Sequence, residues 1–123
     1  MGEKSHNKKL YSKEFYSVCP IETTLNLIGN KWKLLIVRDL LEGKKRFGEL
    51  KKSISASKNQ LISQNVLTQN LRVLEEAKIL KRKIYAEVPP KVEYSLTDLG
   101  ESLSGILGSL ESWGSAYQNS LKK

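Results

Sequence analysis

The chain has 123 residues, 39% hydrophobic and 7% aromatic, so it can bury one modest core built mainly from aliphatic side chains. Its 21 lysines and arginines outnumber 13 acids, and the resulting net charge of +8 favours a polyanionic partner. The single cysteine excludes an intrachain disulfide framework. No apolar run has the length of a membrane span, and the polar N-terminus lacks the apolar core of a signal peptide. We therefore expect a cytoplasmic protein without a membrane partner.

The positive charge is concentrated in one part of the chain. Residues 1–97 hold 19 basic and 10 acidic residues, whereas residues 98–123 hold 2 basic and 3 acidic ones. Residues 1–9 are polar and basic with almost no apolar side chain, which predicts a disordered tail. Residues 10–123 are predicted to form a single domain, in which a basic working part precedes a near-neutral C-terminal segment.

Helices are predicted for the first part of this domain. Apolar residues at helical spacing indicate a short helix over 10–18 and a second helix that begins at Pro20, where a missing amide hydrogen costs nothing. The second helix should end at Gly29. Its buried face is predicted to consist of Ile21, Leu25 and Ile28.

Two further helices and a polar connector follow. Apolar spacing predicts a helix over 31–42 that ends before Gly43, and a short helix over 48–54. Residues 55–60 are polar, so we interpret them as a connector to the next helix. A short helix, a turn and a longer helix in this order are typical of a helix-turn-helix motif.

The stretch 63–76 is predicted to be the longer helix. Ser63 is a favourable N-cap residue. Helical spacing places on one apolar stripe Leu67, Leu71 and Leu74. The opposite face carries side chains whose donors and acceptors can read base edges in a major groove, namely Gln64 at its margin, Asn65, Thr68, Gln69 and Arg72. For a polar face alone, an ordinary solvated surface is the alternative interpretation.

The acids of this helix stand where the helix dipole disfavours them. Glu75 and Glu76 lie at its C-terminal end, and its first three turns contain no acid. This arrangement suits a helix that presents its N-terminal half to phosphates and keeps its acids away from them.

After residue 77 the pattern changes from helical to alternating. Residues 80–85 and 92–96 alternate between two faces, which predicts two strands. Pro89 and Pro90 exclude a central strand position between them, so we expect a hairpin over 80–96 that forms a wing. The basic residues of this wing are Lys81, Arg82, Lys83 and Lys91. The predicted fold class is mostly α with a small β-hairpin (α+β), a winged helix-turn-helix.

A long helix is predicted over 98–121, after the capping residue Thr97. Its apolar residues recur at spacings of three and four, which is the pattern of a heptad seam. The seam contains Leu103, Ile106, Leu110, Trp113 and Tyr117. We interpret it as a homodimer interface, because the preceding helices already supply enough apolar faces for a core. The alternative is a long helix packed on its own domain.

Five segments match one known family in the right order. They are CPIE at 19–22, LIGNKW at 27–32, RFGEL at 46–50, ISQNVLTQNLR at 62–72 and EVPPKVEYSLT at 87–97. On these segments, which extend over most of the chain, the sequence resembles the HxlR-type winged helix-turn-helix transcriptional regulators of bacteria. The resemblance implies a DNA-binding homodimer that controls a nearby promoter, with 63–76 in the major groove, 80–96 as the wing and 98–121 in the dimer contact.

The resemblance also bears on Cys19. Some members of the family use the cysteine at this position to sense oxidants or electrophiles, and the start of a helix favours a thiolate. A small buried thiol that packs in the core is the alternative. The sequence identifies no small-molecule effector.

The chain departs from the family in two places. The connector between Leu50 and Ile62 is longer than usual, so either the preceding helix gains a turn or residues 55–60 loop out. Lys78 stands where relatives often have the glycine that ends the recognition helix. A left-handed lysine costs roughly 1 kcal/mol more than glycine, which predicts a differently built cap.

Each candidate residue is thereby given a role. Base-edge contacts are expected of Asn65, Thr68, Gln69 and Arg72, of which Gln69 and Arg72 can equally bind phosphate. Phosphate contacts are expected of Lys45, Arg46, Ser63, Lys83 and Lys91.

No enzymatic function is predicted for this chain. The sequence lacks a phosphate-binding loop, a nucleophile elbow and metal-ligand spacing, so we expect no catalytic residue, metal or cofactor. The competing hypothesis is a winged-helix interaction module that binds a protein or RNA. The acid-free, amide-rich face of 63–76 beside a basic wing favours double-stranded DNA, with an inverted-repeat operator for a homodimer.

Overall fold

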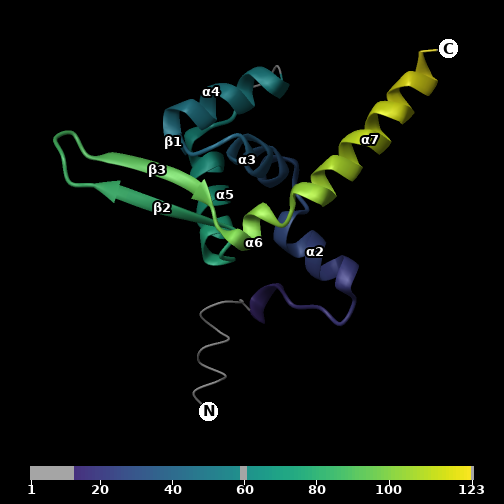
Figure 1. Cartoon of the computed structure of the whole chain (residues 1–123), viewed down its shortest axis with the longest axis horizontal. Coiled ribbons are helices and arrows are strands. Elements are labelled where there is room, and N and C mark those ends of the chain that lie inside the picture. Colours follow the sequence, from purple (N-terminus) through teal and green to yellow (C-terminus); the bar gives the residue numbers. More distant parts are fainter. Residues whose placement is uncertain (1–12, 59–60, 123) are drawn as a thin grey trace.

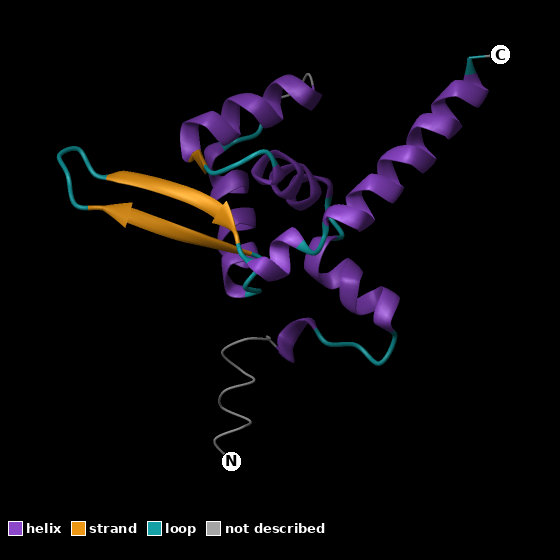
Figure 2. Cartoon of the chain, in the orientation of Figure 1, coloured by secondary structure: helices purple, strands orange, loops and turns teal. Residues whose placement is uncertain are grey.

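The computed structural model describes residues 13–58 and 61–122, so the predicted tail 1–9 and the start of the predicted 10–18 helix lie outside the described residues. The elements, shown in Figures 1 and 2, are the 3₁₀ helix η1 (Lys13–Phe15), α2 (Pro20–Ile28), α3 (Lys31–Leu41), β1 (Lys45–Arg46), α4 (Phe47–Lys58), α5 (Gln64–Glu76), β2 (Leu80–Tyr85), β3 (Lys91–Leu96), α6 (Asp98–Glu101) and α7 (Ser104–Leu121). Among them, no helix is both long and apolar enough to cross a membrane.

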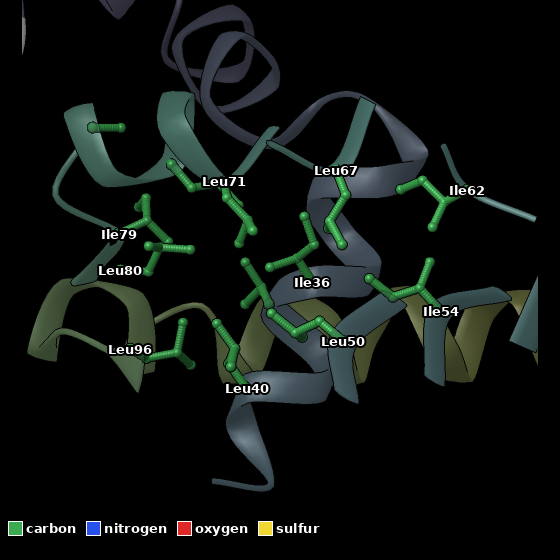
Figure 3. Close-up of a cluster of buried hydrophobic side chains, with 13 residues drawn as sticks. Ile36, Leu40, Leu50, Ile54, Ile62, Leu67, Leu71, Ile79, Leu80 and Leu96 are labelled. Carbon is green, nitrogen blue, oxygen red and sulfur yellow. The ribbon is translucent and has the colours of Figure 1, made fainter. Parts of the chain in front are cut away.

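The core lies where α3, α4, α5 and the base of the hairpin meet (Figure 3). Its buried side chains are aliphatic, as the composition predicts, and aromatic rings pack only at its margin. The core includes Ile36, Val37 and Leu40 of α3, Leu50 and Ile54 of α4, Leu67, Leu71 and Leu74 of α5, and Leu80 and Leu96 of the strands. The apolar stripe predicted for α5 is therefore confirmed.

The sheet has three antiparallel strands in the order β1-β3-β2. The hairpin predicted over 80–96 is confirmed, and in Figure 1 it projects from the helical body on the side opposite α7. Strand β1 was not predicted, and its residues pair with Tyr94 and Glu93 of β3. A strand of two residues is too short to show an alternating pattern.

The longer connector between Leu50 and Ile62 is mainly an extension of the helix α4. The helix predicted over 48–54 begins at Phe47 and continues to Lys58, so the prediction of a connector that starts at residue 55 is wrong. No glycine or proline lies between Glu49 and Lys58, and Ile54 is fully buried, so the helix gains a turn. The amide of Ile62 then donates a 3.2 Å hydrogen bond to Ser55 Oγ, which ties the segment before α5 to α4.

The prediction that one face of α2 is buried is wrong for two of its three residues in the single chain. Ile28 is buried, but Ile21 is 71% exposed and Leu25 is 58% exposed. The reason is the position of α2, which contacts α3 and η1 and otherwise projects from the body (Figure 1). Its apolar pattern is real, but no element of the described chain covers it.

The predicted helix over 98–121 is divided into α6 and α7. Thr97 caps α6, as predicted, by accepting a 3.1 Å hydrogen bond from the amide of Gly100. A Cβ at Gly100 would lie 2.1 Å from the carbonyl oxygen of Ile79, so only glycine permits this close contact between α6 and the base of the hairpin. Residues 102 and 103 then redirect the chain into α7, which has no buried residue.

Lys78 does adopt the left-handed conformation, with φ of 65°, so the prediction of a differently built cap is wrong. Its amide donates to the carbonyl of Glu75 at 3.0 Å, and the amide of Ile79 donates to that of Leu74 at 2.9 Å. These two bonds form a Schellman motif, and buried Leu74 and Ile79 supply its apolar contact. The packing of Ile79 therefore holds the lysine in a conformation that glycine adopts more readily.

Candidate nucleic-acid interface

The orientation of α5 is fixed at its start and along one side. Ser63 precedes the helix in an extended conformation, and its Oγ accepts a 3.1 Å hydrogen bond from the amide of Val66. The leucine stripe at Leu67, Leu71 and Leu74 is buried against the core. Since one side of the helix is held inward, the residues on the other side must face outward.

The structure brings the predicted base-edge candidates together on the outward face of α5. Asn65, Gln69 and Arg72 are exposed and Thr68 is half-buried. Within the described residues, none of these four side chains makes a hydrogen bond or an ion pair. Gln64, at the margin of the face, is also exposed. The face thus presents unpaired donors and acceptors on a rigid helix, which is what direct reading of base edges requires.

A polar residue on the inward side of α5 was missed by the sequence analysis. Asn70 is 7% exposed, and its Nδ2 donates a 2.8 Å hydrogen bond to the carbonyl of Val66. Its Oδ1 accepts a 2.9 Å hydrogen bond from Nδ2 of Asn30, the N-cap residue of α3. Asn70 lies three residues after Leu67 and four before Leu74, so helical spacing places it inside the apolar stripe. This position was the signal in the sequence that Asn70 is buried.

One acid at the end of α5 has a structural partner. Glu75 Oε2 lies 3.7 Å from Nε of Arg82 on β2, so this ion pair joins the helix to the wing. Both side chains are partly exposed, and such a pair contributes at most about 1 kcal/mol. The unfavourable position of Glu75 against the helix dipole is thus offset in part by Arg82.

The wing carries a compact polar cluster on one face. The register places Lys83 beside Glu93 and Tyr85 beside Lys91. The ammonium groups of Lys83 and Lys91 each lie 4.8 Å from the centre of the Tyr85 ring. Glu93 Oε1 accepts a 2.6 Å hydrogen bond from the Tyr85 hydroxyl, and its carboxylate lies 3.5 Å from Nζ of Lys44 and 3.6 Å from Nζ of Lys91.

The contacts within this cluster shift the pKa values of Glu93 and Tyr85. The hydrogen bond from Tyr85, together with the nearby Lys44 and Lys91, lowers the pKa of Glu93 below its ordinary value of 4.5, although burial acts against this. The same hydrogen bond, with burial and the charge of Glu93, raises the pKa of Tyr85. Glu93 is therefore a carboxylate at neutral pH and neutralises part of the basic charge on the wing.

The two basic candidates of β1 have different surroundings. Lys45 is half-buried, and its Nζ lies 3.5 Å from Oε1 of Glu42, whereas Arg46 is exposed. The amide of Arg46 donates a 2.8 Å hydrogen bond to Glu49 Oε1, which anchors the start of α4 in the manner of a capping box. A groove of about 480 Å³ separates Arg46 from Lys91 at the tip of the wing. Two of the predicted phosphate contacts therefore line one depression.

Cys19 is exposed at the start of α2, so the alternative of a buried core thiol is wrong for the single chain. Its side chain makes no capping hydrogen bond, while its carbonyl accepts the amide of Thr23 at 3.0 Å. Exposed apolar residues, Val18 and Ile21, lie on either side of it in the sequence. The sulfur atom is accessible to solutes in an isolated chain.

The predicted dimer seam lies on the exposed surface of α7. Leu103 is half-buried against the core, and the remaining seam residues Ile106, Leu110, Trp113 and Tyr117 are exposed. The rings of Trp113 and Tyr117 are stacked, with centroids 5.4 Å apart. Leu110 still borders α3 along one hollow, whereas Trp113 and Tyr117 lie beyond it and are 69% and 53% exposed, so packing on its own domain does not cover this part of α7.

Three comparisons with known proteins agree with this geometry. The family model described as HxlR-like helix-turn-helix matches residues 27–122. The HTH-type transcriptional regulator YdeP of Bacillus subtilis is 42% identical over 120 residues, which cover 95% of this chain and 90% of YdeP. The crystal structure of the HTH-type transcriptional regulator ytcD is 46% identical with a TM-score of 0.74, and the match covers 83% of this chain and 99% of that one. The redox regulator HypR in its oxidized form is 43% identical with a TM-score of 0.72, and the match covers 80% of this chain and 96% of HypR.

Proposed function

Because this chain belongs to the HxlR-like helix-turn-helix family, whose relatives are transcriptional regulators, we propose that it recognises a specific operator in double-stranded DNA as a homodimer. The family assignment confirms the resemblance found in the sequence. The observation that carries the proposal is the outward face of α5, where unpaired polar side chains stand opposite a buried leucine stripe. As a regulator of transcription it would act beside the chromosome in the cytoplasm and perform no catalysis.

The proposal gives α5 and the wing different tasks. Asn65, Thr68, Gln69 and Arg72 would contact base edges in the major groove, because they form one exposed face of α5. Phosphate oxygens would be bound by Lys45, Arg46, Ser63, Lys83 and Lys91, with Gln64 at the edge of the base-reading face. Phosphate contacts add affinity on any sequence, whereas base contacts add affinity on the operator alone.

The proposed dimer joins the exposed apolar surfaces of α7 and α2. Both project from the helical body away from the wing (Figure 1), and both expose large apolar side chains that a second copy of the chain would cover. A two-fold dimer presents two copies of α5, and these would enter successive major grooves about 34 Å apart. The operator would accordingly be an inverted repeat whose half-sites are one helical turn apart.

A redox response through Cys19 is the finer part of the proposal. Cys19 is exposed, and HypR, which is described as a redox regulator, is a close structural neighbour. Because the chain has one cysteine, two Cys19 thiols from different subunits, or one Cys19 thiol and a small thiol, would lose two hydrogens to an oxidant and form a disulfide.

The decisive experiment separates base reading from phosphate binding. Wild type would first select a duplex from a randomised library, and each variant would then be titrated against this duplex and a shuffled one at several salt concentrations. Arg72→Ala or Gln69→Ala should weaken binding to the selected duplex by about 1–3 kcal/mol and reduce discrimination. Lys91→Ala should weaken binding to both duplexes alike and lower the salt slope by roughly one unit.

Lys122→Ala, which removes one positive charge from the end of α7, serves as the control for net charge. It should leave the salt slope nearly unchanged, because Figure 1 shows the end of α7 far from both α5 and the wing. If the α5 variants bind the selected duplex as tightly and as selectively as wild type, α5 is not the reading element. A wild type that selects no sequence would favour an interaction module for protein or RNA.

A further inference from the structure

The polar bridge between α3 and α5 stands out because the rest of their contact is apolar. The two helices meet through core residues such as Ile36, Leu67 and Leu71 (Figure 3). Aliphatic packing fixes which side of α5 faces inward, but because it is non-directional it tolerates small rotations and displacements of the helix better than a hydrogen bond does. Inside this contact, Asn70 of α5 is buried and hydrogen-bonded to Asn30 at the start of α3.

Hydrogen bonds fix the orientation of both amide groups in the bridge. Asn30 Oδ1 accepts the amide of Lys33 at 2.9 Å, and this bond leaves its Nδ2 free to donate to Asn70 Oδ1. The Nδ2 of Asn70 in turn donates to the carbonyl of Val66, one turn earlier in α5. The two amide groups therefore fix each other and are both tied to the backbone of their own helices.

A small displacement of α5 would break this bridge. A rotation or shift that carries Asn70 Oδ1 well beyond its 2.9 Å distance from Asn30 Nδ2 would leave this buried oxygen without its donor from α3. Leaving such a group unsatisfied is costly, and single buried asparagines fix the register of packed helices elsewhere. The same rotation would move Gln69 and Arg72, which lie one and two residues from Asn70, relative to the base edges.

From this geometry we infer that the Asn30–Asn70 bridge is a specificity-determining positioning device, which sets the rotation of α5 without contacting DNA. The inference rests on the proposed function, because it requires α5 to be the reading helix. The bridge contributes little to affinity for arbitrary DNA, since phosphate contacts tolerate small rotations better than base-edge hydrogen bonds do. Its loss therefore lowers the affinity for the operator more than the affinity for arbitrary DNA.

Two variants remove the bridge from opposite ends. Asn70→Ala removes both hydrogen bonds of Asn70 but introduces the best helix former, and the Asn30 amide it releases is exposed and can bond to water. Asn30→Ser keeps an N-cap acceptor for the amide of Lys33, yet its shorter side chain cannot reach Asn70. Ile36→Val is the matched control, because it loosens the same core without changing a polar contact.

The experiment measures thermal unfolding of each variant together with its affinity for the library-selected duplex and for the shuffled duplex. Asn70→Ala and Asn30→Ser should each reduce the ratio of the two affinities by roughly fivefold or more, the effect of one lost base-edge contact. The double variant should be no less selective than the more affected single variant, because both changes break one bridge. Ile36→Val should lower the unfolding temperature and leave the ratio unchanged.

Three results would overturn the inference, and they are distinguishable. If wild type selects a sequence and both bridge variants discriminate as wild type does, the bridge has no positioning role and the proposed function stands. If Ile36→Val reduces the ratio as much as the bridge variants do, discrimination follows stability alone. If wild type selects no sequence, the inference and the proposed function fail together.

Discussion

Dimerisation through α7 is the property most open to a quantitative test. The perturbation replaces Leu110 and Trp113 together by Asp. Leu110 is 51% exposed and Trp113 is 69% exposed in the single chain, so covering them would contribute about 1 and about 3 kcal/mol respectively. In a two-fold dimer each substitution occurs twice, which gives a loss of about 8 kcal/mol before the cost of burying four carboxylates.

A loss of this size would convert even a nanomolar dimer, with a binding free energy of about −12 kcal/mol, to the millimolar range. Sedimentation velocity at micromolar concentration should therefore show a dimer for wild type and a monomer for the variant. The matched control is Ser112→Asp with Ser115→Asp, which adds the same charge to the opposite side of α7. A variant that remains dimeric, or a control that also becomes monomeric, would refute the assignment of the seam.

Three further outcomes are expected. Diamide should change the operator affinity of wild type in a gel shift and not that of Cys19→Ser, because Cys19 is exposed; equal responses would exclude a thiol sensor. Lys78→Gly should raise the free energy of unfolding by about 1 kcal/mol because Lys78 has φ of 65°, whereas Lys78→Ala, still a poor left-handed residue, should not. Tyr85→Phe should raise the pKa of Glu93 toward 4.5 in an NMR titration of its carboxyl carbon. Because the folded-state pKa of Glu93 is lowered, the stability from this hydrogen bond is present above about pH 4.5 and is lost as the pH falls through the lowered pKa. The free energies of unfolding of wild type and Tyr85→Phe should therefore converge in acid. A difference between them that persists unchanged at low pH would contradict this reasoning.

Much of the helix-turn-helix was predictable because its information is local. The period of the leucines in α5, the capping residue Ser63 and the alternation in the hairpin each lie within one element. Capping and periodicity depend on neighbouring residues, so the sequence alone indicates them. The exposed polar face of α5 followed directly from the position of its buried stripe.

The features that escaped prediction depend on residues far apart in the chain. Asn70 meets Asn30 across 40 positions, and Gly100 of α6 lies against the carbonyl oxygen of Ile79 at the base of the hairpin. Glu93 was part of a family motif, but its hydrogen bond with Tyr85 depends on the strand register. Periodicity gives each side chain a direction, and it leaves undetermined which partner the side chain meets.

The exposed apolar faces of α2 and α7 show that a sequence pattern can predict burial without showing which element covers the face. Ile21 of α2 and Trp113 of α7 both follow helical spacing, yet the first was assigned to the core and the second to a dimer, and both are exposed in the single chain. An isolated helix of 18 residues is marginal in water, and α7 has no buried residue to hold it, while three glycines weaken it further. Packing against the partner subunit that we propose would supply the stabilisation that the chain itself lacks at this end. The full length of α7 and the proposed dimer would then depend on each other, and the spacing between the two copies of α5 would depend on both.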